Sequence, residues 1–307
     1  MAKTAFIFPG QGAQYVGMAK DFYDKYEECR KVIDKADELM DFDLKSIMFD
    51  ENDLINKTEY TQAAMLAAEC CILKAVELKG IKADITAGLS LGEYAALVAS
   101  GVIDFEDAMK LVRKRGMYME NEVPAGKGAM AAVIALDSEI IDKICDEITK
   151  ESGKVVSAAN YNCPGQIVIS GYKESVDEAA VRLKEAGAKL VTMLNVSGPF
   201  HSAMLKGAGD KLAEELKGVA FSKPEIPYIN NVAAEVVTDS ENISDTLERQ
   251  VYSPVRWQQT MEKMIADGVD TFYEIGPGKT LAGFMKRIDR SMKVITINTV
   301  EDLETLA

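Results

Sequence analysis

The segment Gly88-Leu89-Ser90-Leu91-Gly92 constrains the fold of this chain more than any other. The residues before it, 81–87, have the composition of a short β-strand, and residues 93–99 are typical of a helix. A serine between two glycines at such a junction predicts a nucleophile elbow, a sharp turn that exposes the hydroxyl at the helix N-terminus. The glycines allow the turn and the close packing of strand and helix, while helix N–H groups favour a developing oxyanion. We therefore expect an α/β fold in which Ser90 is a candidate nucleophile.

The chain contains one histidine, His201. A serine that attacks an acyl carbon needs a base to take its proton, and His201 is the base that serine chemistry would use here. The alternative is a core or surface histidine without a chemical role. The sequence Ser197-Gly198-Pro199-Phe200-His201-Ser202 places it in a Gly-Pro loop just after a predicted strand, where catalytic groups are commonly displayed. This context favours the catalytic interpretation.

Length and composition indicate an ordinary globular protein. The 307 residues are 48% hydrophobic and 27% charged, which allows one large core with a smaller satellite domain. The N-terminal apolar run is too short for a signal peptide and is interrupted by Pro9-Gly10. No stretch approaches the roughly 20 apolar residues of a membrane span. We therefore expect a cytoplasmic protein without membrane segments.

Cysteine content and charge argue against several further classes. The cysteines are odd in number, have no C-x-x-C spacing and could recruit only one histidine, so neither disulfides nor a metal site are expected. Cys70-Cys71 lies in the apolar helical stretch 63–73, which predicts inert burial. A net charge of -14 argues against nucleic acid as a partner. It also disfavours anionic partners unless a local basic patch reverses the field.

The N-terminal region follows a strand, turn and helix order. Residues 4–8 predict a buried strand, and residues 16–40 predict a helix. The turn Pro9-Gly10-Gln11-Gly12 lacks both glycine-rich phosphate-binding patterns, so a phosphate cradle is disfavoured. Backbone N–H groups that serve an oxyanion are more consistent with an elbow serine, because such sites take a second donor from another strand-end loop.

The middle of the chain predicts a small domain inserted into a larger one. The element order from residue 128 to 196 is β-α-β-β-α-β, the ferredoxin-like order, and the expected ranges are 129–136, 138–150, 155–160, 166–170, 174–185 and 189–196. The insert follows the flexible composition of residues 124–128 and closes at Gly198-Pro199. We therefore expect residues 1–127 and 198–307 to form a large α/β domain, residues 128–197 the insert, and the cleft between them to hold Ser90 and His201.

Arg115 lies on the apolar stripe of a predicted helix that begins after Asp104. An inward guanidinium cannot remain unpaired at low free-energy cost, so it needs a carboxylate. That carboxylate is either a structural Asp or Glu, or a carboxylate of the substrate. In the second case the planar fork of arginine would favour a dicarboxylic half-thioester such as malonyl over acetyl.

Several motifs together resemble the malonyl-CoA:acyl carrier protein transacylase family over nearly the whole chain. In chain order, the motifs are Pro9-Gly10-Gln11-Gly12, Gly88-Leu89-Ser90-Leu91-Gly92-Glu93, Arg115-Gly116, Ala159-Asn160-Tyr161-Asn162, Pro199-Phe200-His201-Ser202, Asn230-Asn231-Val232 and Gly276-Pro277-Gly278. The resemblance implies an α/β hydrolase-like core domain with an inserted ferredoxin-like small domain, which agrees with the predicted organisation.

The resemblance also implies roles for individual residues. Ser90 would be the nucleophile, His201 the general base and later acid, and Arg115 the clamp on the malonyl carboxylate. The backbone N–H groups of Gln11 and Leu91 would form the oxyanion hole.

Further residues match family positions around the acyl site. Gln250 matches a position whose backbone carbonyl orients the histidine. Gln62, Asn160 and Asn231 match lining positions, with a capping or turn role as the alternative for each. Phe200 precedes the histidine, where an aromatic ring suggests an unbranched malonyl group.

The implied activity is the transfer of a malonyl group from coenzyme A to the phosphopantetheine thiol of acyl carrier protein, in fatty acid biosynthesis, with no metal or redox cofactor. Both partners are anionic, so local basic groups would have to bind them. The candidates are Lys184, Lys189, Lys279, Lys286, Arg287, Arg290 and Lys293, with a scattered solvated surface as the alternative.

Two other functions fit the same motifs. An esterase or thioesterase would use the same serine and histidine, with Asp137 or Asp177 as the triad acid. A non-catalytic protein would keep the fold and hold a malonyl thioester without forming a covalent bond.

Overall fold

The computed structural model describes residues 3–306 and contains two β-sheets, each with its own helices. The larger sheet has six strands in the order β10-β9-β1-β2-β7-β8 and is parallel except for the β7–β8 pair. The strands of this sheet are β1 (Lys3–Phe8), β2 (Ile85–Gly88), β7 (Tyr228–Ile229), β8 (Val236–Val237), β9 (Val269–Ile275) and β10 (Lys293–Ile297).

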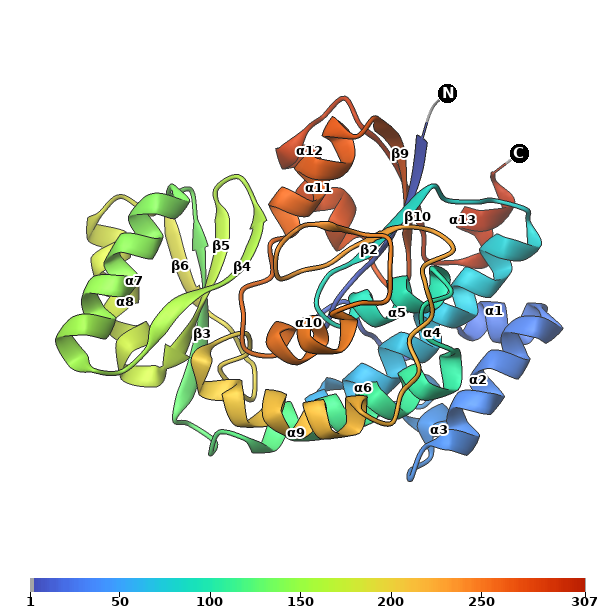
Figure 1. Ribbon diagram of the computed structural model, residues 1–307, viewed down its shortest axis with the longest axis horizontal. Helices are drawn as coiled ribbons and strands as arrows, with labels where there is room; N and C mark the ends of the chain where they lie inside the picture. The colour runs from blue at the N-terminus through green and yellow to red at the C-terminus, as the bar shows by residue number, and fades with distance from the viewer. Residues whose placement is uncertain (1–2, 307) are drawn as a thin grey trace.

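Helices cover both faces of this sheet, as expected when most strands are parallel (Figure 1). Strand β1 shows the reason, because its side chains alternate between two apolar cores: Phe6 and Phe8 pack on one side, Ala5 and Ile7 on the other. The helices are α1 (Lys20–Lys25), α2 (Glu27–Leu39), α3 (Leu44–Phe49), α4 (Thr58–Leu78), α5 (Gly92–Ala99), α6 (Phe105–Asn121), α9 (Lys206–Leu216), α10 (Ile243–Gln250), α11 (Trp257–Ala266), α12 (Thr280–Ile288) and α13 (Val300–Glu304), with 3-10 turns η1 (Leu54–Asn56) and η2 (Ala203–Leu205).

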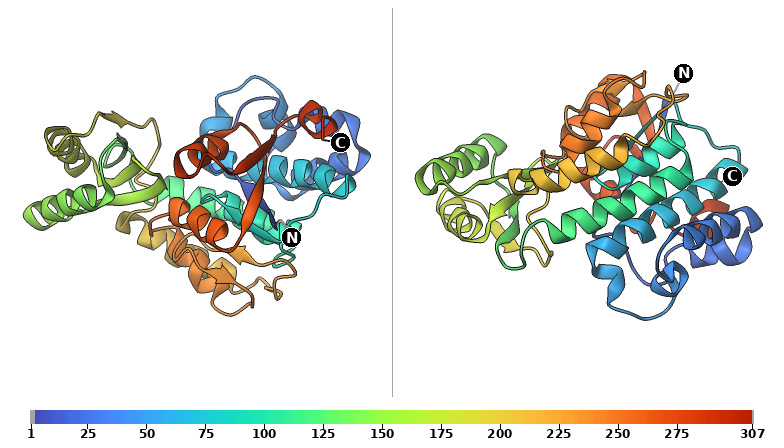
Figure 2. Two further views of the ribbon diagram at one scale, coloured as in Figure 1. Left: turned by 90° about the horizontal axis from the view of Figure 1, so that it is seen from above. Right: turned by 60° about the horizontal axis from the view of Figure 1, so that its bottom comes forward.

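The two cores are unequal. The larger one takes its side chains from α4, α5 and α6, and Figure 2 shows α4, α6 and α9 as neighbouring long helices. The smaller one is formed with α11 and α12 and contains Trp257, which is fully buried. The sheet therefore lies between two helical layers, and the loops at the carboxyl ends of its strands come together at one edge.

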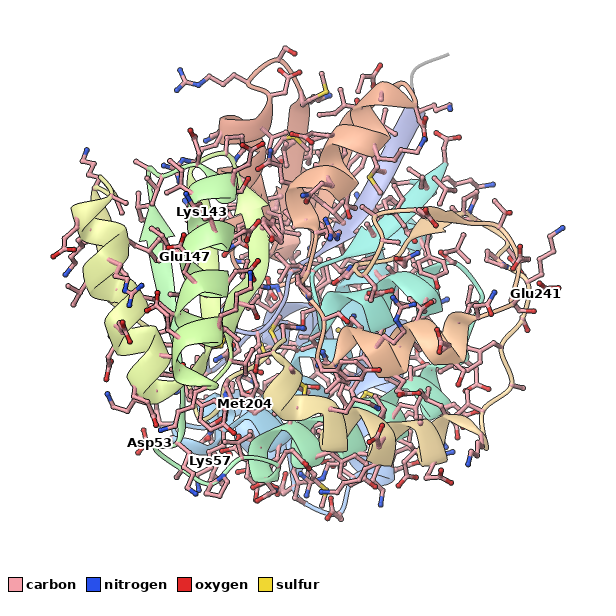
Figure 3. All side chains as sticks on the ribbon, turned by 60° about the vertical axis from the view of Figure 1, so that its left-hand side comes forward. Asp53, Lys57, Lys143, Glu147, Met204 and Glu241 are labelled. Atoms are coloured by element: carbon pink, nitrogen blue, oxygen red, sulfur yellow. The ribbon has the colours of Figure 1, made fainter. Side chains whose placement is uncertain are left out.

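The second sheet has four antiparallel strands in the order β4-β5-β3-β6. Its elements are β3 (Gly128–Ile134), α7 (Ser138–Ser152), β4 (Val156–Cys163), β5 (Gln166–Tyr172), α8 (Lys173–Glu185) and β6 (Leu190–Met193). One face packs against the apolar stripes of α7 and α8, which gives this unit a core of its own. The outer surface of α7 is charged, and Figure 3 shows Lys143 and Glu147 on it.

The strand-to-helix turn between β2 and α5 depends on its two glycines. A Cβ on Gly88 would lie 1.9 Å from the carbonyl of Gly92, and a Cβ on Gly92 would lie 2.4 Å from the carbonyl oxygens of Phe8 and Pro9. Ser90 between them has a φ of 55°, in the left-handed region that a non-glycine residue rarely adopts. The predicted elbow is therefore present: Gly88 allows the turn to fold back on the start of α5, and Gly92 allows the start of α5 to pack against the end of β1.

Most predicted elements are confirmed, and the differences have local causes. The predicted helix over residues 16–40 is wrong as a single element, because Tyr26 is extended and separates α1 from α2. The Tyr26 ring stacks on Phe22, four residues before it, and no proline or glycine marks this break in the sequence. The strands predicted over 81–87 and 189–196 are shorter than expected. Within residues 3–306, none of the helices combines the length and apolarity needed to cross a bilayer.

Gly88→Ala is expected to reduce the free energy of unfolding by about 3 kcal/mol, because the added methyl group overlaps backbone atoms that cannot move aside. Gly283→Ala is the matched control: it lies in α12 with nothing within 4 Å of the new Cβ, and it should stabilise the protein by up to about 1 kcal/mol. Urea unfolding followed by circular dichroism measures both changes. Equal effects of the two substitutions would contradict the close-packing argument.

Candidate active site

Ser90 is held in its strained turn by Asn231, which follows β7 in the chain. The backbone N–H of Ser90 donates to Asn231 Oδ1 at 2.6 Å, and Asn231 Nδ2 donates to the carbonyl of Gly88 at 2.7 Å. One buried side chain thus bonds to the backbone on both sides of Leu89. These bonds offset part of the free energy that the left-handed conformation of Ser90 costs, which is on the order of 1–3 kcal/mol.

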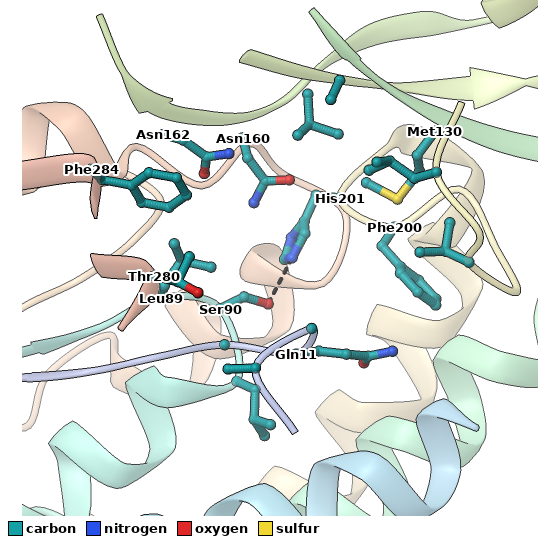
Figure 4. Close-up of a pocket in the computed structure, with 18 of the residues that line it drawn as sticks. Gln11, Leu89, Ser90, Met130, Asn160, Asn162, Phe200, His201, Thr280 and Phe284 are labelled. Atoms are coloured by element: carbon teal, nitrogen blue, oxygen red, sulfur yellow. Dashed lines mark hydrogen bonds between the residues drawn. The ribbon is translucent and has the colours of Figure 1, made fainter. Parts of the chain in front are cut away.

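The His201 ring lies beside the serine hydroxyl (Figure 4). His201 Nε2 is 2.7 Å from Ser90 Oγ, and His201 Nδ1 is 2.8 Å from the carbonyl oxygen of Gln250, the last residue of α10. A carbonyl can only accept a hydrogen bond, so Nδ1 carries the proton and Nε2 is free to accept the one on Ser90. His201 itself has a φ of 57°, so both members of the pair sit in left-handed turns.

Burial keeps His201 neutral. Loss of solvent is the largest cause that lowers its pKa, to about 4, and the positive charge of Arg115 acts in the same direction. The Gln250 carbonyl opposes the shift by bonding to the protonated ring edge. At neutral pH the imidazole is therefore an unprotonated base, as general-base catalysis by a serine-histidine pair requires.

Arg115 projects from α6 into the interior and is 1% exposed. Its Nη1 donates to Gln62 Oε1 at 2.8 Å, and its Nη2 donates to Gln250 Oε1 at 2.8 Å and to Ser90 Oγ at 3.1 Å. The guanidinium also lies 5.7 Å from the centre of the Tyr94 ring. The expectation of a structural carboxylate as its direct partner is wrong for the part of the chain that the structure describes, because two amide oxygens take that place.

Glu93 is a buried member of this network that sequence reasoning missed. Its Oε2 accepts hydrogen bonds from Gln250 Nε2 at 2.7 Å and from the backbone N–H of Asn231 at 3.2 Å. Burial raises the pKa of Glu93 to about 7, against the lowering effects of these two bonds and of Arg115. The available signal was a carboxylate in the first turn of α5, among residues that are otherwise almost all apolar.

A cavity of about 370 Å³ opens in front of Ser90 and His201, between the two sheets. It receives side chains from β3, β4 and β5 of the small sheet, and from the loops of the large sheet and α12. Figure 4 shows Asn160, Asn162 and Phe284 at one side of the histidine and Phe200 with Met130 at the other. Of the sequence-predicted residues, those that line the cavity are Ser90, His201, Gln11, Leu91, Gln62, Asn160 and Phe200.

The other three predicted residues, Arg115, Asn231 and Gln250, lie on the side of Ser90 and His201 away from the cavity and contact this pair directly. For Gln250 this involves both the main chain and the side chain. Its carbonyl accepts from His201, and its Nε2 also donates to the carbonyl of Ser90 at 2.9 Å. These residues set the orientation of the pair from behind, while the cavity stays open in front.

Two backbone N–H groups point to an anion site near the serine. The N–H groups of Gln11 and Leu91 find no acceptor among residues 3–306, and both residues line the cavity beside Ser90. Leu91 is the residue that directly precedes α5, so its N–H belongs to the positive end of that helix. Such donors can stabilise an oxyanion on an acyl carbon attached to Ser90.

The acids proposed for a hydrolase triad do not reach His201. Asp137 directly precedes α7, and Asp177 forms an ion pair with Lys173 on the surface of α8. The Nδ1 side of His201 is instead bonded to the Gln250 carbonyl. A triad that contains either aspartate is therefore excluded in this structure.

The structure leaves the candidate basic groups exposed, and none of them forms an ion pair with a described residue. Arg287 donates to Gln166 Oε1 at 2.8 Å, and Gln166 lines the cavity. Lys279, Lys286 and Arg290 border a second hollow on the surface of α12. Across residues 3–306, no group of three or more His, Cys, Asp or Glu side chains is arranged to hold a metal ion.

Comparison with known proteins gives one consistent result. Residues 5–302 match the family model of the acyl transferase domain. The malonyl CoA-acyl carrier protein transacylase of Bacillus subtilis (strain 168) is 45% identical over 305 residues, which is 99% of this chain and 96% of that protein.

Two solved structures superpose closely. An acyl carrier protein S-malonyltransferase from Vibrio cholerae has a TM-score of 0.96 at 44% identity, with 100% of both chains covered. A malonyl-transacylase in complex with its type II PKS acyl-carrier protein has a TM-score of 0.95 at 42% identity, covering 99% of this chain and 98% of that one.

Labelling of Ser90 by a serine-directed fluorophosphonate is expected to lose rate only as the pH falls through about 4, because His201 accepts the serine proton only while it is neutral. The second-order rate constant, measured from neutral pH downward with circular dichroism to verify folding at each pH, tests this. His201→Ala is the control and should label at least about 100-fold more slowly, without that inflection. An inflection near the ordinary histidine pKa of about 6.5 would contradict the buried, neutral ring.

Proposed function

Since this chain belongs to the malonyl CoA-acyl carrier protein transacylase family, we propose that it transfers a malonyl group from coenzyme A to the phosphopantetheine thiol of acyl carrier protein, as a step of fatty acid biosynthesis. The observation that carries the proposal is the contact of Ser90 Oγ with both His201 Nε2 and Arg115 Nη2. A nucleophile with its base suits acyl transfer, and a buried cation beside it suits an acyl group that ends in a carboxylate.

The first half-reaction forms a malonyl ester on Ser90. His201 Nε2 takes the Ser90 proton as Oγ attacks the thioester carbon, and the oxyanion that develops accepts from the N–H groups of Gln11 and Leu91. The carbon–sulfur bond then breaks, and the coenzyme A sulfur leaves with the proton from His201. The Gln250 carbonyl stabilises the imidazolium that exists between these two proton transfers.

The second half-reaction runs the same steps in the opposite direction. The phosphopantetheine thiol enters the cavity, His201 takes its proton, and the sulfur attacks the ester carbon of malonyl-Ser90. The Ser90 oxygen leaves and regains a proton from His201. One thioester replaces another, so the main task of the site is to keep water away from the ester intermediate, and the enclosing residues Phe200, Met130 and Phe284 suit that task.

Arg115 supplies selectivity for the malonyl group. Its guanidinium now bonds to the neutral oxygens of Gln62 and Gln250, and Gln62 lines the cavity. A malonyl carboxylate that replaces one of these oxygens forms two parallel, charge-assisted hydrogen bonds with the guanidinium. An acetyl group has no carboxylate and cannot form them. Phe200 lines the cavity next to His201 in the chain, and an aromatic ring at this position suits an unbranched malonyl group.

The finer division of the fold is part of this proposal. Residues 1–127 and 198–307 would form an α/β hydrolase-like core, and residues 128–197 a ferredoxin-like insert. The order β4-β5-β3-β6 supports the insert, because a βαββαβ unit of that fold places its first and third strands at the centre of the sheet. A cytoplasmic location belongs to the same proposal, and the five free, buried cysteines are consistent with it.

Docking of the two anionic partners is assigned to the seven candidate basic groups named in the sequence analysis. Lys184 lies on α8, and Lys189 directly precedes β6. The other five basic residues lie on or near α12, whose residues Thr280, Leu281 and Phe284 line the cavity. Because these cations have no acidic partner among the described residues, they can attract phosphates despite the net charge of -14.

Incubation with malonyl-CoA should add the mass of one malonyl group to the intact protein. Ser90→Ala should remain unmodified, and addition of acyl carrier protein with its phosphopantetheine thiol should discharge the adduct into malonyl-acyl carrier protein. Intact-protein mass spectrometry measures both steps. Rapid release of free malonate without transfer would instead indicate a hydrolase, and tight binding without adduct or turnover would indicate a binding protein.

Arg115→Ala is expected to lower kcat/KM for malonyl-CoA by about 100-fold or more, because the forked pair with the carboxylate is lost. Turnover of acetyl-CoA by the same variant serves as the internal control and should fall much less, because this substrate loses only the contact of Arg115 with Ser90 Oγ and no pairing with a carboxylate. Arg115→Lys retains the positive charge without the planar fork, so its kcat/KM for malonyl-CoA should lie between those of the unaltered protein and Arg115→Ala. Equal losses for malonyl-CoA and acetyl-CoA in a folded variant would show that Arg115 does not read the carboxylate.

A further inference from the structure

The Gln250 side chain connects the two buried charges of the site. Its Oε1 accepts from Arg115 Nη2 at 2.8 Å, and its Nε2 donates to Glu93 Oε2 at 2.7 Å. The amide therefore lies between a cation and a carboxylate with its dipole aligned to both. In a medium of low dielectric constant, the hydrogen bond of this amide to Arg115 and its hydrogen bond to Glu93 strengthen each other.

Neither charge has another counter-charge in the part of the chain that the structure describes. Arg115 forms no ion pair there, and Glu93 forms none either. Both residues are fully or almost fully buried, at 1% and 0% exposed. An isolated buried charge is strongly unfavourable, so each of these groups depends on the other across Gln250.

We propose that Glu93 is the counter-charge of Arg115 in the free protein, and that Glu93 takes up a proton from solvent when the substrate carboxylate binds to Arg115. The inference rests on the proposed function, because it is the malonyl carboxylate that brings the second negative charge. Once that carboxylate is paired with Arg115, the cation no longer balances an ionised Glu93. Protonation restores the balance, and the proton goes to a carboxylate of which one oxygen, Oε1, has no hydrogen-bond partner in the structure.

The groups that face Glu93 make the direction of the change clear. Arg115 on α6 is the charged neighbour, and it lowers the pKa of Glu93. Tyr94 on α5 and Tyr228 on β7 are the titratable neighbours, and burial raises the pKa of each phenol well above neutrality, so both stay uncharged. His201 belongs to the network through the Gln250 carbonyl and is neutral for the reason given above.

The sign of the linkage follows from these neighbours. In the free protein the pKa of Glu93 is about 7, which includes the lowering effect of Arg115. A substrate carboxylate cancels that effect and raises the pKa, so binding consumes protons at neutral pH. The affinity for a malonyl thioester should therefore decrease as the pH rises above about 7, by at most tenfold per pH unit.

Isothermal titration calorimetry in two buffers of different ionisation enthalpy counts the protons taken up on binding. Ser90→Ala should be used, because it binds malonyl-CoA without forming the ester, and acetyl-CoA is the matched ligand that lacks the second carboxylate. At about pH 7.5 we expect roughly half a proton to be taken up with malonyl-CoA beyond any taken up with acetyl-CoA. The double variant Ser90→Ala, Glu93→Gln keeps the shape of the side chain and should lose this difference, with an affinity for malonyl-CoA that no longer varies between about pH 6.5 and about pH 8.5.

The outcomes separate the two proposals. Equal proton uptake with malonyl-CoA and acetyl-CoA in Ser90→Ala would overturn the inference, and this result does not depend on whether the Glu93→Gln variant folds. Uptake that persists in the double variant would assign the proton to another group, such as His201, and would also overturn it. A failure of the proposed function would look different, since malonyl-CoA would then neither bind nor modify Ser90.

Discussion

The site depends on how closely α5 approaches β1 and β2. Gly88 and Gly92 leave no room for a methyl group at either side of the turn, so the helix N-terminus lies directly against the strand ends. This contact forces Ser90 into the left-handed region and exposes its hydroxyl. Asn231, Gln250 and the Pro9-Gly10-Gln11-Gly12 loop all take their positions from this turn, because each contacts or adjoins its backbone. Without the two glycines the other residues would have no fixed serine hydroxyl to surround.

The polar network behind the serine combines tasks that many serine enzymes assign to separate residues. Gln250 orients His201 with its main chain and holds Arg115 and Glu93 with its side chain. Asn231 supports the turn and bonds Glu93 through its own N–H. Because these residues share partners, the effects of substitutions within the network should not be additive. Because the Gln250 carbonyl occupies the Nδ1 side of His201, this imidazole has no acidic side chain as its partner among the described residues.

Local patterns in the sequence were sufficient to predict the main elements and the pairing of Ser90 with His201. The glycines around Ser90, the Gly-Pro loop before His201 and the apolar row that contains Arg115 each have a direct physical meaning, and the structure places these three residues in contact. The role of the Gln250 carbonyl has no side-chain signature, because every residue carries such a group, and only the family resemblance pointed to it. Glu93 was overlooked because one acidic residue in the first turn is a common helix feature. The amide partners of Arg115 come from segments far apart in the chain, which no local pattern contains, and the break at Tyr26 has no proline or glycine to signal it.

The solitary histidine has a practical consequence for spectroscopy. His201 is the only histidine in the sequence, and its ring contacts the Ser90 hydroxyl on one edge and the Gln250 carbonyl on the other. In a magnetic resonance spectrum its ring protons and nitrogens therefore need no assignment by mutagenesis, and every change in them originates at this one location. Once its nitrogens are labelled with 15N, His201 therefore reports the tautomer and charge of the imidazole beside Ser90 without interference from any other histidine.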